Sequence, residues 1–270
     1  MKAEQAKKIA DRALEQLAAA LESGRSEELT RYLSMLAKFH RYSVGNVLLI
    51  LSQMPDATHV AGFNTWRKMG RFVKKGEKGI VIIAPMVMRQ KDESADDRDR
   101  PIIRFRAVYV FDVSQTEGDP LPEPASVGGD PGEHLDRLRR VVTGLGIVLD
   151  QDDLPMGADG VSRGGRISIR AGLKPAHEFS VTVHELAHEL LHHGDDRPGS
   201  KTVRETEAEA VAFVVCQAIG LDSGTAASDY IHLYRGDTET LTESLERIQR
   251  TATEIIAALH GVAVEPSHTA

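Results

Sequence analysis

The stretch VTVHELAHELLHHG, residues 181–194, constrains this chain more than any other part of it. Its many apolar residues favour a buried helix, and in a helix His184 and His188 lie on one face with Glu185 beside them. Unpaired imidazoles are costly in an apolar environment, and a shared metal ion removes that cost. The HExxH pattern therefore predicts a metal centre, with satisfied core histidines as the alternative.

The donor types in this motif suit zinc. Two imidazoles and a carboxylate from elsewhere give a tetrahedral Zn2+ ion three protein ligands and leave its fourth position for water. Zinc lowers the pKa of that water to about 7, and Glu185 can accept its proton as it attacks a carbonyl group. The sequence thus predicts a zinc-dependent hydrolase with Glu185 as its general base.

The third ligand is expected on the next helix, which contains RETEAEAVAF. Glu205 and Glu209 are one turn apart on one face of this helix, whereas Glu207 lies on the opposite side. We assign Glu205 as the metal ligand and Glu209 as the residue that hydrogen-bonds a ligating imidazole. Two alternatives stay open: the reverse assignment, and a solvated acidic first turn favoured by the helix dipole.

Other side chains near the motif are harder to assign. His192 is excluded as a ligand because eight residues of helix place it about 12 Å from His184. A donor that stabilises a developing oxyanion is expected over the site, and the segment SDYIHLY offers Tyr230 as the candidate. Amphipathic helix packing is the simpler explanation for Tyr230.

A second feature is the segment TWRKMGRFVKKGEKG, residues 65–79, where six basic residues and one acidic residue give a local charge of +5 in a chain of net charge −7. Such a segment can bind phosphates, and nearby aromatic rings can stack on unpaired bases. The alternative is a solvated loop with Trp66 in the core. The predicted contacts with single-stranded DNA are Tyr42, Asn46, Trp66, Arg67, Lys68, Arg71, Lys74, Lys75 and Lys78.

Apolar periodicity and turn residues divide the chain into two parts of α+β class. N-terminal helices with a small antiparallel sheet are followed by a mainly helical part with a short sheet. A stretch rich in proline, glycine and acidic residues separates them, as expected of a linker. The predicted division is a first domain at 1–118, a linker at 119–133, a second domain at 134–262 and a flexible tail at 263–270.

Composition limits where the protein works and what it binds. No run of about 18 apolar residues suggests a membrane span or a membrane partner, and the amino terminus lacks a signal-peptide core. Cys216 is the only cysteine, so an intramolecular disulfide and a thiolate zinc cluster are excluded. We therefore expect a cytoplasmic protein whose contact with nucleic acid is local, since its pI is near 5.9.

The segment YSVGNVLLILSQMPDATHVAGFNTWRKMGRFVKKGEKGIVIIAP resembles the N-terminal domain of ArdC-like antirestriction proteins. HELAHELLHH together with RETEAEAVAF resembles the zincin-like metallopeptidase domain of that family, which is also similar to ImmA/IrrE peptidases. The resemblance implies single-stranded DNA binding, metal ligands at His184, His188 and Glu205, and Glu185 as the base. ELLHHGDD departs from the tryptophan-containing turn of ArdC.

Together these features predict a single-stranded-DNA-binding zinc metallopeptidase of antirestriction type. Its substrate is a protein, which can itself be bound to DNA. The alternative is a non-catalytic DNA-binding antirestriction protein with a structural metal. A metal-dependent nuclease is disfavoured because two-metal nuclease sites favour clustered carboxylates.

Overall fold

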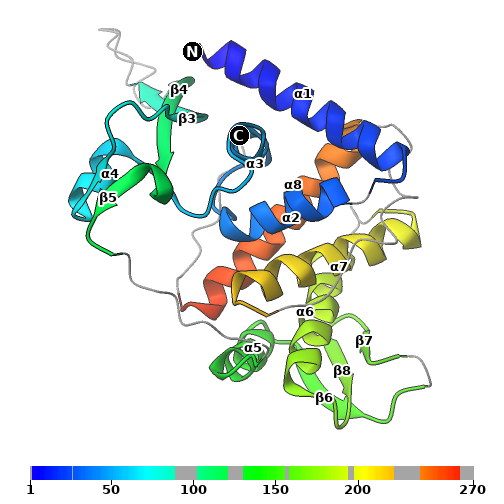
Figure 1. Cartoon of the computed structure of the whole chain (residues 1–270). Helices are drawn as coiled ribbons and strands as arrows, with labels where there is room; N and C mark the ends of the chain where they lie inside the picture. Colours follow the sequence, from blue (N-terminus) through cyan, green and yellow to red (C-terminus); the bar gives the residue numbers. More distant parts are fainter. Residues whose placement is uncertain are drawn as a thin grey trace, which may run out of the picture. The chain divides into compact units, whose positions relative to one another are not determined.

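The computed structural model describes residues 2–25, 27–88, 102–120, 130–155, 158–193, 198–221 and 238–261. Tyr230 and most of the predicted linker and tail lie outside these residues. The described residues group by their contacts into two compact units. Unit 1 comprises Met1–Gln16 and Gly45–Leu121, and unit 2 comprises Leu17–Val44 and Pro122–Ala270. Both contain helices and short sheets, which confirms the predicted α+β class (Figure 1).

Unit 1 is built on a three-stranded antiparallel sheet with strand order β1-β4-β3. A separate two-stranded antiparallel ribbon pairs β2 with β5. The core where helices meet the sheet includes Ala6, Ala10, Leu49 and Val81. The elements are α1 (Ala3–Glu22), whose residues after Gln16 belong to unit 2, α3 (Val44–Gln53), β1 (Val60–Gly62), α4 (Phe63–Lys68), β2 (Arg71–Val73), β3 (Ile80–Met88), β4 (Ile102–Asp112), η1 (Val113–Gln115) and β5 (Thr116–Gly118).

Helix α3 covers the open edge of this sheet with two side-chain amides. Asn46 accepts from the Ile83 nitrogen and donates to the Ile83 oxygen, both at 2.8 Å. Gln53, two turns later, makes the same pair of bonds with Val81, both at 2.9 Å. Because β3 is an edge strand, these bonds satisfy backbone groups that would otherwise be unpaired.

Unit 2 is mainly helical and has one small mixed sheet of order β6-β8-β7. Strand β6 runs parallel to β8, and the edge strand β7 runs antiparallel to it. The elements are α2 (Glu27–Lys38), α5 (Glu133–Gly144), β6 (Val148–Asp152), β7 (Gly160–Ser162), β8 (Arg166–Arg170), α6 (Pro175–Leu191), α7 (Lys201–Ala218) and α8 (Thr238–Leu259).

The core of unit 2 forms where α7 packs against α6 and α8. Its fully buried side chains include Val183 and Leu186 of α6, Val211 and Val215 of α7, and Leu245 of α8. Cys216, near the end of α7, is also buried there, and burial raises the pKa of its thiol to about 12. Cys216 is therefore an unreactive core thiol.

Helix α2 belongs to unit 2, although the prediction placed it in the domain 1–118. It packs against α7. Just beyond its end, the His40 carbonyl accepts hydrogen bonds from Gln249 at 2.9 Å and Thr253 at 2.7 Å, both on α8. These contacts hold a segment from the start of the chain in the helical unit.

Candidate metal centre

Three donor atoms from α6 and α7 converge on one point. The Nε2 atoms of His184 and His188 lie 3.1 Å apart. Oε2 of Glu205 lies 3.6 Å from the first and 3.4 Å from the second. Tetrahedral ligands at 2.0–2.1 Å from a zinc ion are separated by roughly 3.3 Å. These three atoms, called the donor triangle below, therefore have the spacing that a metal ion requires.

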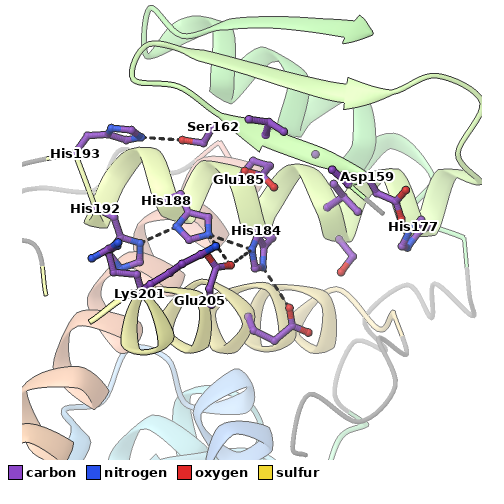
Figure 2. A pocket seen from close by; sticks show the side chains of 17 residues that line it. Asp159, Ser162, His177, His184, Glu185, His188, His192, His193, Lys201 and Glu205 are labelled. Atoms are coloured by element: carbon purple, nitrogen blue, oxygen red, sulfur yellow. Dashed lines mark hydrogen bonds and ion pairs between the residues drawn. The ribbon is translucent and has the colours of Figure 1, made fainter. Parts of the chain in front are cut away.

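The starts of the two helices explain why these residues meet. Pro175 opens α6 at its first turn, where a missing N–H costs nothing. Ser200 caps α7 by accepting from the Val203 nitrogen at 3.4 Å. From this start, Glu205 and Glu209 fall one turn apart on the side of α7 that contacts the histidines, where Figure 2 shows Glu205.

Glu209 contacts the outer side of the same histidine pair. Its Oε2 lies 3.2 Å from Nδ1 of His184, whereas Glu205 approaches Nε2 of that ring. A carboxylate accepts a hydrogen bond from Nδ1–H, so in the neutral ring Nε2 of His184 presents its lone pair to the donor triangle. The Glu205 oxygen thus belongs to the donor triangle, and the Glu209 oxygen lies on the other side of the His184 ring.

The donor triangle holds atoms that repel one another unless a cation lies between them. Burial lowers the pKa of His184, but hydrogen bonds to Glu205 and Glu209 outweigh it and raise the pKa to about 9. The neighbouring His184 and His188 rings lower the pKa of Glu205. Without a metal ion, a proton on His184 thus supplies the positive charge that the site requires.

Glu185 lies beside the donor triangle and is almost fully buried. Burial raises the pKa of its carboxyl. Gly160 of β7 approaches it so closely that an added Cβ would lie 2.7 Å from Glu185 Cγ and 2.8 Å from Oε1. A side chain at position 160 would displace the carboxylate, so glycine at this position makes room for Glu185.

An open cleft of about 980 Å³ runs along the donor triangle, between β7 on one side and the start of α7 on the other (Figure 2). Lys201 and Arg204 of α7 line one wall, and Asp159 and His177 line the opposite end. The His177 ring contacts the Asp159 carboxylate at 2.9 Å. The cleft is thus large enough for a ligand larger than water and has charged groups of both signs.

Two histidines that follow the HExxH motif also have partners. His193 contacts Ser162 at 2.8 Å, and Ser162 donates to Glu189 at 2.6 Å. His192 lies outside the donor triangle, where its Nδ1 is 2.9 Å from Nδ1 of His188. The sequence interpretation gave neither histidine a role. A glutamate inside an apolar helix, Glu207, was the available signal for the His192 contact described below.

In unit 1 the basic segment 65–79 forms α4, β2 and a turn rather than one loop. Four of its cations are exposed and make no ion pair with any described residue: Arg67, Lys68, Lys75 and Lys78. Two others are engaged, because Arg71 bonds Thr116 Oγ1 at 2.8 Å and Lys74 bonds the Ser114 carbonyl at 2.8 Å. The segment therefore keeps a strong unneutralised positive charge.

Three predicted DNA contacts are placed differently from the prediction. Trp66 is only 2% exposed and its Nε1 donates to the Phe111 carbonyl, so the prediction of a stacking surface there is wrong and the core alternative holds. The Asn46 amide is occupied by the edge of β3. Tyr42 is half-buried against Phe39 in unit 2, not in the unit that carries the basic segment.

Other aromatic rings are exposed on unit 1. Phe63 and Phe72 flank the buried Trp66 in the sequence and lie on the surface, as do Phe105 and Tyr109 of β4. Phe105 is the most exposed of these rings, at 65%. The sequence interpretation missed Phe105 and Tyr109 because strand alternation alone does not show which face is covered.

No helix in the described part of the chain is both long and apolar enough to cross a bilayer.

Comparisons with known proteins agree with these features. Residues 3–111 match the family model of the N-terminal domain of anti-restriction factor ArdC. The chain is 25% identical to an uncharacterized protein of Bacillus anthracis, with 94% of this chain and 51% of that protein aligned. The chain thus spans about half the length of this relative.

Two solved structures have the same fold over nearly the whole chain. Both are of the antirestriction protein ArdC from plasmid R388. The metal-free structure has a TM-score of 0.55 at 17% identity and covers 96% of this chain and 99% of that chain. The Mn(II)-bound structure has a TM-score of 0.56 at 16% identity and covers 93% and 98%. Residues 3–111 therefore resemble the ArdC N-terminal domain, which confirms the ArdC-like resemblance seen in the sequence, and the two solved structures share the fold of the chain.

Proposed function

We propose that this protein is a cytoplasmic ArdC-type antirestriction protein that binds single-stranded DNA and carries a zinc-dependent metallopeptidase centre. The observation that carries the enzymatic part is the donor triangle with Glu185 buried beside it in an open cleft. A purely structural metal would not require an adjacent buried carboxylate or a cleft. The protein substrate can itself be bound to DNA.

The donor set supports Zn2+ as the cofactor. Imidazole nitrogens suit zinc, and a site of this kind binds Zn2+ more tightly than Mn2+ in the general affinity order of divalent metals. The ArdC protein of plasmid R388 has been crystallised with Mn(II). Metal analysis of the purified protein and competition between the two ions therefore test the choice of zinc.

The residues around the donor triangle support hydrolysis of a peptide bond. A bound zinc ion would supply a Lewis acid and an activated water. Glu185 would accept a proton at its carboxylate, and its raised pKa favours holding that proton for transfer to the leaving nitrogen. The edge strand β7 lines the same cleft, and an extended peptide can pair with such an edge. Tyr230 remains the proposed oxyanion donor.

The basic segment supports single-stranded DNA binding by unit 1. Arg67, Lys68, Lys75 and Lys78 are exposed cations without an ion-pair partner among the described residues. Phe63 and Phe72 are exposed in and next to the same segment and can stack on unpaired bases. Arg71 and Lys74 stay in the proposed interface, although each already bonds a protein oxygen.

The decisive experiment compares the wild type with Glu185→Gln, which keeps the volume of the side chain and removes its charge. We expect Glu185→Gln to retain zinc and the wild-type melting temperature and to lose cleavage by about 10²- to 10⁴-fold. Cleavage is measured by sequencing new protein termini after incubation with a host lysate. Glu178→Gln, the same change on α6 outside the cleft, is the control.

Protection of incoming DNA separates the two functional hypotheses. If Glu185→Gln abolishes both cleavage and protection of unmodified plasmid DNA from restriction, the peptidase is part of the antirestriction activity. If protection survives in full, or if the wild type cleaves no protein, the non-catalytic alternative with a structural metal replaces the peptidase proposal.

A further inference from the structure

A buried hydrogen-bonded chain leads from the donor triangle through α7 to α8. Nδ1 of His188 lies 2.9 Å from Nδ1 of His192, and Nε2 of His192 lies 3.1 Å from Oε2 of Glu207. Oε1 of Glu207 accepts from Ser244 Oγ at 2.5 Å and from Arg247 Nη2 at 2.6 Å. His192 and Glu207 are 3% and 0% exposed. Figure 2 shows His184, His188 and His192 in a row along α6.

The partners of Glu207 determine which atom donates and which accepts in each of these hydrogen bonds. A carboxylate paired with Arg247 accepts only, so Nε2 of His192 must donate to it. In a neutral imidazole the other nitrogen is then an acceptor, so Nδ1 of His192 accepts from Nδ1 of His188. That leaves the lone pair of His188 on Nε2, the atom that lies in the donor triangle.

We propose that His192 and Glu207 are positioning residues that hold the His188 ring in the orientation and tautomer required for metal binding. The inference rests on the proposed metal centre and assigns a role to the histidine that follows the HExxH motif by four residues. Ser244 and Arg247 complete it by fixing Glu207 from α8. A ligating histidine generally donates its second ring N–H to such a partner.

The two ligating histidines differ in how firmly they are held. His184 has one orienting carboxylate, Glu209, which is 51% exposed and therefore competes with water. His188 is held by groups that are almost completely buried, and an unmatched polar group there would carry a large desolvation cost. If packing were their only role, a buried histidine and glutamate would stabilise the protein no better than apolar residues of similar size. Their complete satisfaction by one another and by α8 is accounted for by the role of His188.

Three substitutions of His192 separate its two hydrogen bonds. The side-chain oxygen of asparagine is bonded to Cγ, as Nδ1 is in histidine. His192→Asn therefore keeps an acceptor for His188 and loses the contact with Glu207. Glutamine has a nitrogen in the place of Nε2, so His192→Gln keeps the donor to Glu207 and loses the acceptor. His192→Phe removes both. Thr206→Val is the matched control, because Thr206 is buried next to Glu207 in the sequence and takes no part in these hydrogen bonds.

Zinc affinity of the full-length protein is measured by competition with a chromophoric chelator. We expect His192→Gln and His192→Phe to bind zinc about 10- to 100-fold more weakly than the wild type, with His192→Asn between them and the wild type. Thr206→Val should bind as the wild type does. Equal affinity in all three His192 variants, or equal loss in His192→Asn and His192→Phe, would overturn the positioning role.

Nitrogen-15 NMR of the histidine rings in chelator-treated protein gives a readout that does not depend on bound metal. The wild type and His192→Asn should show His188 protonated at Nδ1, and His192→Gln should show a mixture of tautomers. A wild-type His188 protonated at Nε2 would refute the inference. Failure of the wild type to bind zinc would refute the metal centre instead, so the two failures are distinguishable. If a His192 variant does not fold, Glu207→Gln takes its place in both measurements.

Discussion

The metal centre of unit 2 and the basic segment of unit 1 use charged side chains in opposite ways. In the candidate metal centre three donor atoms converge on one place, and Glu209 and His192 contact the two histidine rings from outside. In the basic segment the cations are spread over α4, β2 and the turn that follows, and most of them are exposed. The metal centre thus depends on the fixed positions of a few atoms, whereas the basic segment depends on the total positive charge of many exposed side chains.

This difference determines how each region should respond to change. Loss of one donor from a fixed site removes a contact that its neighbours cannot replace, and the remaining buried groups are left unsatisfied. Loss of one cation from an exposed segment removes one of several similar, solvent-screened interactions. Single substitutions should therefore have large effects in the metal centre, and salt should have its large effect on the basic segment.

The largest effect is expected from Glu205→Gln. Glu205 supplies the only carboxylate oxygen of the donor triangle, so zinc affinity should fall more than about 100-fold, beyond the 10- to 100-fold typical of residues that only orient a ligand. Glu209→Gln should fall within that smaller range. Both are measured by chelator competition. A larger loss for Glu209→Gln would reverse the assignment of ligand and orienting residue.

Gly160→Ala should have the next largest effect, and it should act on catalysis rather than on metal binding. The new Cβ would lie within 3 Å of Glu185 and of Val181, so the carboxylate must move. A displacement of about 1 Å can cost on the order of 100-fold in rate. Zinc content by mass spectrometry should stay at the wild-type value while cleavage falls.

Gly144→Ala is the control for that experiment, because an added Cβ at position 144 meets nothing within 4 Å. Equal activity of Gly160→Ala and the wild type would show that Glu185 does not depend on the space provided by β7.

The metal-free protein should lose stability as the pH rises through about 9. The folded-state pKa of His184 is raised to about 9 from 6.5, so its stabilising contribution is complete below pH 6.5 and is lost as pH increases through 9. The shift corresponds to at most about 3 kcal/mol. Urea unfolding with chelator present, between pH 6 and 9.5, measures it. His184→Gln should abolish this pH dependence; its persistence would assign it to another group.

Helical periodicity made much of the metal centre predictable. The four-residue spacing of His184 and His188, and of Glu205 and Glu209, places each pair on one face regardless of the rest of the fold. The contact of His192 with Glu207 spans two helices, and that of Glu207 with Arg247 adds a third. Such contacts depend on how the helices pack, which no local pattern specifies.

The basic segment was less predictable for a related reason. Its charge could be counted from the sequence, but the direction of Trp66 depends on α4 packing against β4, through the bond to the Phe111 carbonyl. The role of Asn46 depends on which strand of the sheet has an open edge.

Strand β7, which lines the cleft of the metal centre in unit 2, has three residues, too few for an alternating pattern to be recognised.

The smallest effect per residue is expected in the basic segment. Replacement of Lys68, Lys75 and Lys78 by glutamine should weaken binding of a labelled single strand about equally for all sequences, since these cations would contact phosphates. The slope of log affinity against log salt should decrease in magnitude by about 2, because each lost phosphate contact on a single strand contributes roughly 0.7. Fluorescence anisotropy at several salt concentrations measures both quantities.

The control for this variant is a second triple substitution with the same change in net charge. Lys2, Lys7 and Lys8 are exposed on or next to α1 and lie outside the basic segment. If their replacement by glutamine lowers the salt slope as much as the first set does, the effect comes from the overall charge of the protein, and the basic segment is not the interface. A decrease confined to the first set would place phosphate contacts on it, and a decrease well below 2 would mean that fewer than three of these lysines touch the strand.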